Sequence, residues 1–334
     1  LVSLCAYRFG RKNYRTLVWQ VSCKSDLSGV NVDGWHGRLS RYFDLLTKLA
    51  IIEAKKRRRH TLKLTNIKSV GILLRPSTPE LREIFYEAKR IFESHGIEVI
   101  VDHVSGGMIG VMGQPFDLMC KKADFLVTIG GDGTLISAVR RSYRFQLPVL
   151  GIHAGKLGFL ADLDMAELET FVAQMLEGEF RIDERAMLQA TITGRNGDTH
   201  VVAFNDIVLT RPSISKMIRL ETYVDGRSFN TYYGDGVVVS TPTGSTAYNL
   251  SAGGPVLFPL TQVFALTPIC PHSLTQRPVV LPGHFEIEMK TPDASALVII
   301  DGQDMIEITE NDTVHIKLAG AGAHLIHRKE FNYF

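Results

Sequence analysis

The 334-residue chain contains only 4 cysteines, the residues whose disulfides cross-link small or secreted domains, and only 2 tryptophans. The cysteines stand at positions 5, 23, 120 and 270, and none belongs to a CxxC pair or to a Cys/His spacing suited to zinc. So low a count argues against a disulfide framework and favours a reducing compartment. We therefore predict a cytoplasmic protein whose side chains form no metal site of their own.

Long hydrophobic runs and two familiar nucleotide motifs are also missing. No apolar stretch reaches the ~18 residues that a membrane-spanning helix needs, and the N-terminus shows no apolar segment followed by a small-residue cleavage site. Neither GxxxxGKS/T nor GxGxxG occurs. We therefore expect no membrane partner, no Walker P-loop and no ordinary Rossmann dinucleotide site.

Positive charge is concentrated at the start of the chain. Residues 1–67 hold 14 Lys/Arg and 4 Asp/Glu, whereas the remainder holds 23 and 31. This segment has no sustained hydrophobic period, and a basic run at residues 55–60 lies near its end. Such a run can bind nucleic acid, but a single run is more often a solvated face. We expect residues 1–67 to be a basic, poorly ordered extension, and we do not expect nucleic acid as a partner.

The next segment, residues 68–180, alternates short apolar runs with amphipathic stretches. Strands are expected at residues 70–74, 97–101, 124–129 and 149–152, and helices at residues 79–92, 134–143 and 166–177. Thr78 is positioned to cap the first helix, and Pro79 suits its first turn. Because the strands are continuous apolar runs, they predict a parallel sheet covered by helices on both faces.

The remaining segment, residues 181–334, is expected to be mostly β. Asp225-Gly226 separates two alternating runs and is a strong hairpin signal. Further short strands are expected at residues 187–193, 199–204, 237–239, 285–290, 296–300, 305–308 and 314–318. His324 and His327 fit a strand near the surface. The last residues of this second domain can return to the first domain.

The string Gly-Gly-Asp-Gly-Thr at residues 130–134 lies between an expected strand and an expected helix. Open α/β sheets bind ligands at this carboxyl edge. Glycines let the backbone approach a phosphate, and the helix N-terminus offers free N–H groups. Asp132 could then accept a hydroxyl proton or hold Mg²⁺. A tight turn in which Asp132 only caps the helix would have the same sequence. The loop alone therefore leaves both interpretations open.

A second string, Thr-Pro-Thr-Gly-Ser-Thr-Ala-Tyr-Asn-Leu-Ser-Ala-Gly-Gly-Pro, occupies residues 241–255. Its hydroxyl groups can bond ribose or phosphate oxygens, and its glycines allow close backbone approach. Tyr248 can stack on a base or donate its hydroxyl. A Gly/Pro-rich loop built on a hydroxyl-bonded turn is the alternative interpretation.

Together the two strings resemble the NAD kinase family, in its bacterial form. The resemblance extends to residues 151–160, to Phe204-Asn205-Asp206 and to residues 301–303, and it runs from about Ser69 to about Phe331. It implies an NAD kinase/diacylglycerol kinase-like fold. It also implies transfer of the γ-phosphoryl group of ATP to the 2′-hydroxyl of the adenosine ribose of NAD, which gives NADP. A homodimer or homotetramer would be the assembly.

The resemblance assigns Asp132 as the base, with Mg²⁺ or another divalent cation bridging the donor phosphates. The residues that would bind the nucleotides are Asp132, Gly133, Asn205, Asp206, Lys216, Tyr233, Asp235, Thr246, Ala247, Tyr248, Asn249, Leu250, Ser251 and Gln303. Asp206 departs from the glutamate that is usual in many members, and its shorter side chain should reach ~1.5 Å less. Lys216 and Tyr233 stand at positions where the residue type varies within the family.

Two other classes of function compete with this one. Similar glycine-aspartate loops occur in diacylglycerol-type lipid kinases and phosphofructokinases, so the loop indicates a phosphoryl donor better than it identifies an acceptor. A lipid kinase would call for an apolar cleft or an amphipathic membrane element, and the sequence shows neither. A non-catalytic NAD(P)-binding regulator would have no need of Asp132. ATP or polyphosphate as donor, and NAD or NADH as acceptor, are left open.

Overall fold

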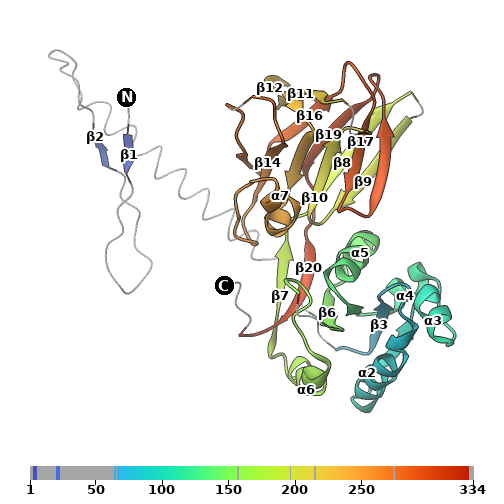
Figure 1. The fold of residues 1–334 in the computed structure, drawn as a ribbon. Coiled ribbons are helices and arrows are strands. Elements are labelled where there is room, and N and C mark those ends of the chain that lie inside the picture. The colour runs from blue at the N-terminus through green and yellow to red at the C-terminus, as the bar shows by residue number, and fades with distance from the viewer. Residues whose placement is uncertain are drawn as a thin grey trace. The chain divides into compact units, whose positions relative to one another are not determined.

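The computed structural model describes residues 3–5, 20–22, 64, 66–155, 158–195, 197–213, 216–273 and 275–330. The chain divides into two units, Leu1–Thr61 and Leu62–Phe334. Figure 1 shows the helices and strands of the second unit. In the first unit, strands β1 (Ser3–Cys5) and β2 (Gln20–Ser22) pair antiparallel. The basic run at residues 55–60 lies outside the described residues. No helix among the described residues is long and apolar enough to cross a membrane.

The second unit contains a mostly parallel six-stranded sheet with the order β4-β3-β5-β6-β20-β7. Its strands are β3 (Ser69–Leu74), β4 (Glu98–Val101), β5 (Phe125–Gly130), β6 (Val149–His153), β7 (Phe180–Arg185) and β20 (Ala323–Arg328). Every residue of β3 and β5 is buried. The continuous apolar runs therefore form a parallel sheet, as predicted.

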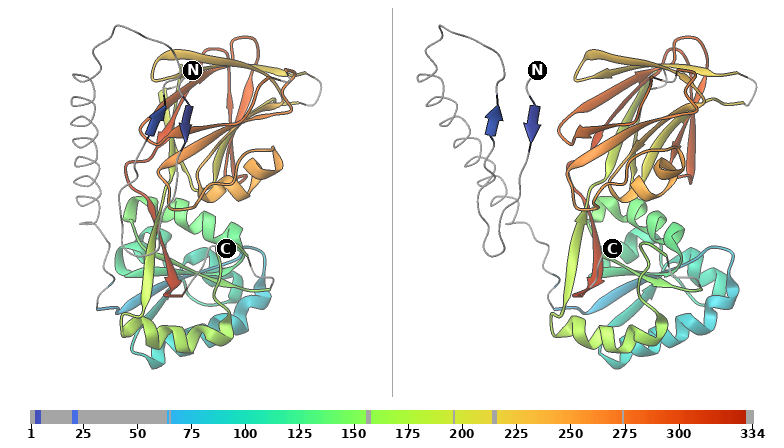
Figure 2. Two further views of the ribbon diagram at one scale, coloured as in Figure 1. Left: turned by 90° about the vertical axis from the view of Figure 1, so that its left-hand side faces the viewer. Right: turned by 60° about the vertical axis from the view of Figure 1, so that its left-hand side comes forward.

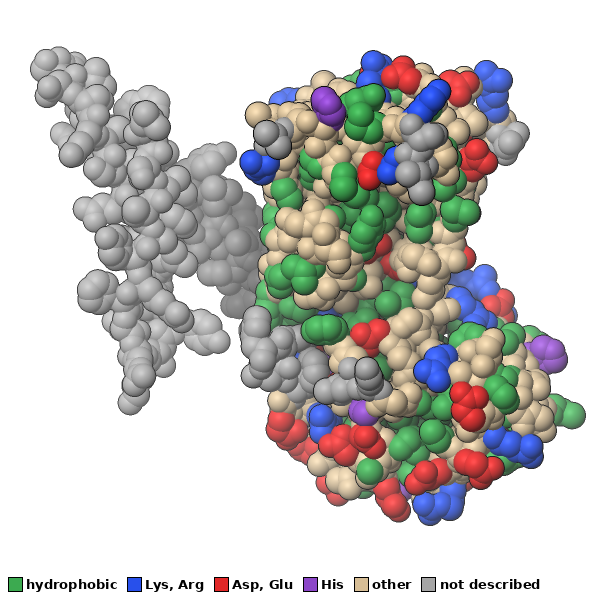
Figure 3. All heavy atoms as spheres, viewed as in Figure 1, with side chains coloured by type: hydrophobic (Ala, Val, Ile, Leu, Met, Phe, Trp, Pro, Cys, Tyr) green, Lys and Arg blue, Asp and Glu red, His purple; other side chains and the backbone are tan. Residues whose placement is uncertain are grey.

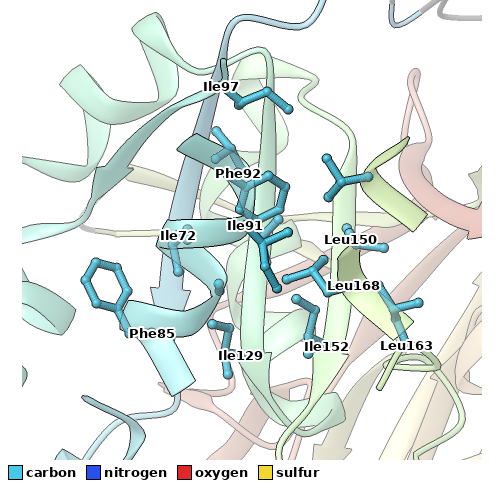
Figure 4. Packing of buried hydrophobic residues seen from close by; sticks show 14 of the residues in the cluster. Ile72, Phe85, Ile91, Phe92, Ile97, Ile129, Leu150, Ile152, Leu163 and Leu168 are labelled. Carbon is cyan, nitrogen blue, oxygen red and sulfur yellow. The ribbon is translucent and has the colours of Figure 1, made fainter. Parts of the chain in front are cut away.

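Helices cover both faces of this sheet. They are α2 (Arg82–Ser94), α3 (His103–Ile109), α4 (Phe116–Lys122), α5 (Asp132–Ser142) and α6 (Leu168–Leu176), with short 3₁₀ turns at Pro79–Leu81, Tyr143–Phe145 and Met165–Glu167. Figure 4 shows Phe85 and Phe92 of α2 packed toward Ile72 of the sheet. Leu73, next along β3, belongs to the core on the opposite face, with Leu135 of α5. The doubly covered sheet is confirmed.

The β-rich half consists of two six-stranded antiparallel sheets, ordered β15-β14-β13-β10-β17-β18 and β12-β11-β16-β19-β8-β9. The strands are β8 (Leu188–Gly194), β9 (Gly197–Ala203), β10 (Asp206–Thr210), β11 (Ile218–Val224), β12 (Arg227–Gly234), β13 (Gly236–Ser240), β14 (Val263–Ile269), β15 (Val279–Pro282), β16 (Glu286–Lys290), β17 (Ala296–Ile300), β18 (Asp304–Ile308) and β19 (Thr313–Leu318). A 3₁₀ turn (Thr243–Thr246) and the short helix α7 (Tyr248–Ser251) follow β13. Residues of both sheets share one buried core. A mostly-β second half is therefore confirmed.

Strand β20 brings the end of the described chain back to the first sheet. It pairs parallel with β6 and antiparallel with β7, and Figure 2 shows β7 and β20 running side by side toward the β-rich half. His327 is 1% exposed within β20, so its predicted place near the surface is wrong. Its ring lies between the carboxylates of Asp162 and Asp183, at 3.3 and 3.6 Å.

The local sequence signals predict one turn correctly and one helix cap and one helix start incorrectly. Asp225 and Gly226 have φ of 47° and 73° at the β11–β12 turn, as the hairpin signal predicts. Thr78 makes no side-chain cap bond, because its backbone at φ −130°, ψ 70° lies outside the usual N-cap conformation. Its hydroxyl instead donates to the carbonyl of Arg75 at 2.6 Å. Helix α5 begins at Asp132, earlier than the predicted Thr134, with Gly131 as its N-cap.

Candidate active site

Asp132 lies in the first turn of α5, directly after the carboxyl end of β5. Its carboxylate accepts the backbone N–H groups of Phe159 at 2.9 Å and of Leu160 and Ala161 at 3.1 Å each. A Cβ on Gly158 would come within 2.8 Å of Cγ of Asp132, so a side chain there would displace the carboxylate or the segment that binds it. The N-cap of α5 is Gly131, and the Asp132 carboxylate bonds residues 159–161 outside the helix. Asp132 is therefore not the helix cap. Three N–H donors hold its carboxylate in one orientation.

A cleft of about 800 Å³ opens beside this loop. Its lining combines the carboxyl edge of the first sheet with the β-rich half, and includes Arg75, Ser105, Gly131, Gly133, Thr134 and Val202. The first N–H groups of a helix have no partner within the helix and bind anions. The N-terminus of α5 therefore gives the cleft an edge of backbone N–H groups that can bind an anion.

A second cluster surrounds the loop at residues 204–206, which joins β9 to β10. Asp206 is buried, and this burial, with the nearby Asp301 carboxylate, raises its pKa to about 7. Among the described residues, Oδ1 of Asn205 is buried and has no hydrogen-bond partner. Since buried polar groups are normally paired, a hydrogen-bond donor on a bound ligand would satisfy Oδ1 of Asn205.

The Thr-Pro-Thr-Gly segment folds against the same loop. Thr241 donates its hydroxyl to the carbonyl of Phe204 at 2.7 Å and its N–H to the carbonyl of Asn205 at 2.8 Å. The hydroxyl also accepts the N–H of Gly244 at 3.0 Å. A Cβ on Gly244 would overlap the carbonyl of Asn205. The glycine therefore permits the close approach of the segment to the loop.

Tyr248 projects beside this junction with 45% of its surface exposed. Its pKa is raised, first by partial burial and then by electrostatic interaction with Cys270, Asp235 and Asp206. The phenol therefore lies near both predicted binding aspartates. A partly exposed ring with a hydroxyl beside carboxylates can stack on a base and bond a ribose.

Three other predicted residues lie at or near the surface of the β-rich half. Asp235 forms an ion pair with Arg211 at 3.1 Å. Tyr233 is 45% exposed, and its ring centroid lies 6.0 Å from that of His272. Lys216 is exposed.

Residues 246–251 differ in how far their side chains are exposed to solvent. Thr246, Leu250 and Ser251 are exposed, and Ala247 is half-buried. Asn249 is fully buried: its amide donates to the carbonyls of Ser245 at 3.1 Å and Pro255 at 3.0 Å and accepts the hydroxyl of Thr267 at 2.6 Å. The Asn249 side chain therefore holds the segment together, and only its backbone can face a ligand.

Gln303 lies beside the loop at residues 130–134. Its amide donates to the carbonyl of Gly133 at 2.9 Å and accepts from Arg140 at 3.2 Å. Arg140 and Asp301 were not predicted as site residues, yet they join the loop to the 204–206 cluster. The signal for Asp301 was its place before a glycine in a three-residue motif. No spacing in the sequence indicated Arg140.

The chain is similar to known proteins over most of its length. The model of the ATP-NAD kinase N-terminal domain matches residues 70–180, and that of the C-terminal domain matches residues 204–328. The chain is 59% identical over 268 residues to the NAD kinase of Sulfurimonas denitrificans, covering 80% of this chain and 94% of the relative. It is 49% identical over 272 residues to that of Wolinella succinogenes, covering 81% and 94%.

Solved structures agree with the fold. Yeast NADH kinase complexed with NADH is similar at a TM-score of 0.71 and 29% identity, over 78% of this chain and 83% of that chain. An NAD kinase from Archaeoglobus fulgidus in complex with ATP is similar at a TM-score of 0.63 and 24% identity, over 78% and 94%.

Proposed function

The chain belongs to the ATP-NAD kinase family, and we infer that it transfers the γ-phosphoryl group of ATP to the 2′-hydroxyl of the adenosine ribose of NAD, giving NADP. One observation within the molecule carries this inference: the loop at residues 130–134 forms an edge of the cleft, and its helix is tied to the loop at residues 204–206. A phosphate-binding edge and an unsatisfied acceptor for a second ligand thus belong to one connected framework. Nothing in the family match favours a lipid kinase or a non-catalytic regulator.

Asp132 is the proposed base. A carboxylate offers about four acceptor positions, and Asp132 uses two on Oδ1 and one on Oδ2. The remaining position on Oδ2 is the one that would take the 2′-hydroxyl proton. Transfer of a phosphoryl group passes through a loose transition state, in which positioning and neutralisation of charge do most of the catalysis. The N–H groups that hold Asp132 therefore serve the reaction by fixing its orientation.

The donor phosphates would bind at Gly133 and the N-terminus of α5. Mg²⁺, or another divalent cation, would neutralise charge on these phosphates. Among the described residues, no group of three or more His, Cys, Asp or Glu side chains is placed to hold a metal. This fits Mg²⁺, which commonly binds through substrate phosphates with only one or two carboxylates. Asp132, next to Gly133 at the start of α5, would be the carboxylate beside these phosphates.

The dinucleotide would bind over Tyr248 and the loop at residues 204–206. Asn205 would accept an N–H group of NAD, Tyr248 would stack on a base, and Asp206 and Asp235 would accept ribose hydroxyls. The remaining proposed contacts come from Lys216, Tyr233, Thr246, Ala247, Leu250, Ser251, the backbone of Asn249 and, at the loop, Gln303. Because Asp206 is buried and its pKa is about 7, it can be protonated near neutral pH and then donate a hydrogen bond as well as accept one.

A homodimer or homotetramer is the proposed assembly, in the cytoplasm. Exposed apolar side chains cluster along one segment of the β-rich half: Tyr248, Leu250, Val256, Phe258 and Leu260. Figure 3 shows hydrophobic side chains gathered around α7. Contiguous apolar surface of this kind is typical of contacts between protein chains. Cys120 and Cys270 are free thiols, which suits a reducing compartment.

The test is a coupled assay of NADP formation from NAD, ATP and Mg²⁺, with wild type and Asp132→Asn in parallel. We expect robust wild-type turnover and a loss of about 10²- to 10⁴-fold in the variant, the range for a removed general base. The dissociation constant of NAD, measured by calorimetry without ATP, should change less than about threefold. Near-normal turnover of Asp132→Asn would contradict its role as the base.

The same assay decides the substrates. Replacing ATP with inorganic polyphosphate and NAD with NADH ranks donors and acceptors directly. A folded wild-type protein that binds NAD and forms no NADP with either donor would overturn the kinase assignment.

A further inference from the structure

Asp301 is buried at the turn between β17 and β18, with no exposed side-chain surface. Its carboxylate accepts three consecutive backbone N–H groups, those of Phe204 at 2.8 Å, Asn205 at 2.7 Å and Asp206 at 2.9 Å. Its own N–H donates back to the carbonyl of Asp206 at 3.0 Å. The left-handed backbone of Asp301, at φ 50°, followed by Gly302 at φ 63°, forms the turn that presents this carboxylate. One side chain thus determines the course of the whole 204–206 loop.

Arg140 connects the same carboxylate to the helix that carries Asp132. It lies about two turns after Asp132 on α5, and its Nε is 3.4 Å from Oδ2 of Asp301. The guanidinium also donates to the carbonyl of Val202 at 3.2 Å, and it bonds Asp304. It further donates to the amide oxygen of Gln303, and the NH₂ group of Gln303 donates to the carbonyl of Gly133. Helix α5 and the 204–206 loop therefore meet at one buried ion pair.

Holding the loop in the fold does not by itself require this pair. Thr241 already bonds the carbonyls of Phe204 and Asn205 from the other side, and β10 continues the loop into a buried sheet. A buried carboxylate costs free energy unless it is paired and hydrogen-bonded. The charged pair adds a defined orientation of the 204–206 loop. A planar guanidinium and three aligned N–H groups can bond the Asp301 carboxylate in only one arrangement.

We propose that Asp301 and Arg140 form a positioning pair that sets the acceptor loop, residues 204–206, at the distance from Asp132 that phosphoryl transfer needs. The inference rests on the proposed function, since the loop carries the NAD contacts of Asn205 and Asp206. The pair touches neither reacting atom in this scheme. It acts through the loop on one side and through α5 on the other.

Asp301→Asn is the main variant. It keeps the shape of the side chain, but one of the two oxygens becomes an NH₂ group that faces either backbone N–H donors or Arg140. The loop must then shift. Since a misplacement of ~1 Å can cost ~10²-fold in rate, we expect kcat to fall about 10- to 100-fold at saturating NAD and ATP. The KM for ATP should stay within about threefold, because the α5 N-terminus is untouched.

Arg140→Lys is the second variant, and it keeps the proposal testable if Asp301→Asn does not fold. Lysine keeps the positive charge opposite Asp301, but one ammonium group cannot bond Val202, Gln303 and Asp301 together. A kcat reduced about 5- to 10-fold is expected. The double variant should lose about as much as Asp301→Asn alone, since two residues that act as one unit give non-additive losses.

Asp124→Asn is the matched control. The Asp124 carboxylate also accepts consecutive backbone N–H groups, those of Lys68 and Ser69 at 2.8 and 2.9 Å, but at the opposite end of the sheet from residues 130–134. It should lower the melting temperature without changing kcat. A kcat within threefold of wild type in both Asp301→Asn and Arg140→Lys, or multiplicative losses in the double variant, overturns the positioning role. A wild type that makes no NADP overturns the proposed function instead.

Discussion

Gly158→Ala tests the structure around Asp132 without altering any reacting group. Gly158 has an ordinary backbone conformation, so alanine adds no strain in φ. Its Cβ, however, would stand 2.8 Å from Cγ of Asp132 and nearer still to Oδ1, where contacts of 3.4–4 Å are ordinary. The carboxylate, or the 158–161 segment that binds it, must therefore move by at least about 0.6 Å.

The size of the effect follows from that displacement. Misplacement of a catalytic group by ~1 Å can cost ~10²-fold in rate, so a movement of roughly 0.6–1 Å should lower kcat about 10- to 100-fold. This corresponds to about 1.4–2.7 kcal/mol of lost transition-state stabilisation. The three N–H bonds to Asp132 would lengthen together, because they come from residues 159–161 of the same segment.

The assay is initial-rate NADP formation at saturating NAD and ATP, with NAD affinity measured separately by calorimetry. Gly107→Ala is the control, since a Cβ at Gly107 in α3 meets nothing within 4 Å. It should leave kcat unchanged and add slightly to helix stability. A Gly158→Ala enzyme that keeps kcat within twofold of wild type would show that the segment yields freely and that its contact does not orient Asp132.

Two further predictions concern stability. Burial, then the Asp301 carboxylate, raises the folded-state pKa of Asp206 to about 7, above its unfolded value of ~3.9; the folded state therefore binds the extra proton, and stability should fall as pH rises from about 4 to 7. Asp206→Asn should flatten that slope in melting temperatures measured at pH 5, 6, 7 and 8, and an unchanged slope would contradict the shift. Asn249→Ala leaves two buried carbonyls and the hydroxyl of Thr267 without partners, which should cost about 3 kcal/mol in urea unfolding. A loss below about 1 kcal/mol would mean that water replaces the amide.

The fold was predicted from short-range patterns in the sequence. The continuous apolar runs of β3 and β5 identified a covered parallel sheet. The errors occurred where local signals compete. Thr78 has the chemistry of a cap, but its hydroxyl bonds backward to Arg75. His327 is polar and was placed near the surface, yet two carboxylates surround it in the interior.

By itself, the sequence determined the elements, the order of the two halves and the glycine-rich loop with Asp132, because these depend on periodicity and on residues that are neighbours in the chain. Only the tertiary structure decided which groups meet: Asp132 with residues 159–161, and Asp301 with both Arg140 and the 204–206 loop. These partners stand up to 161 positions apart, between Arg140 and Asp301. No local propensity encodes such pairs, since their geometry exists only after the sheets have packed and buried the charges together.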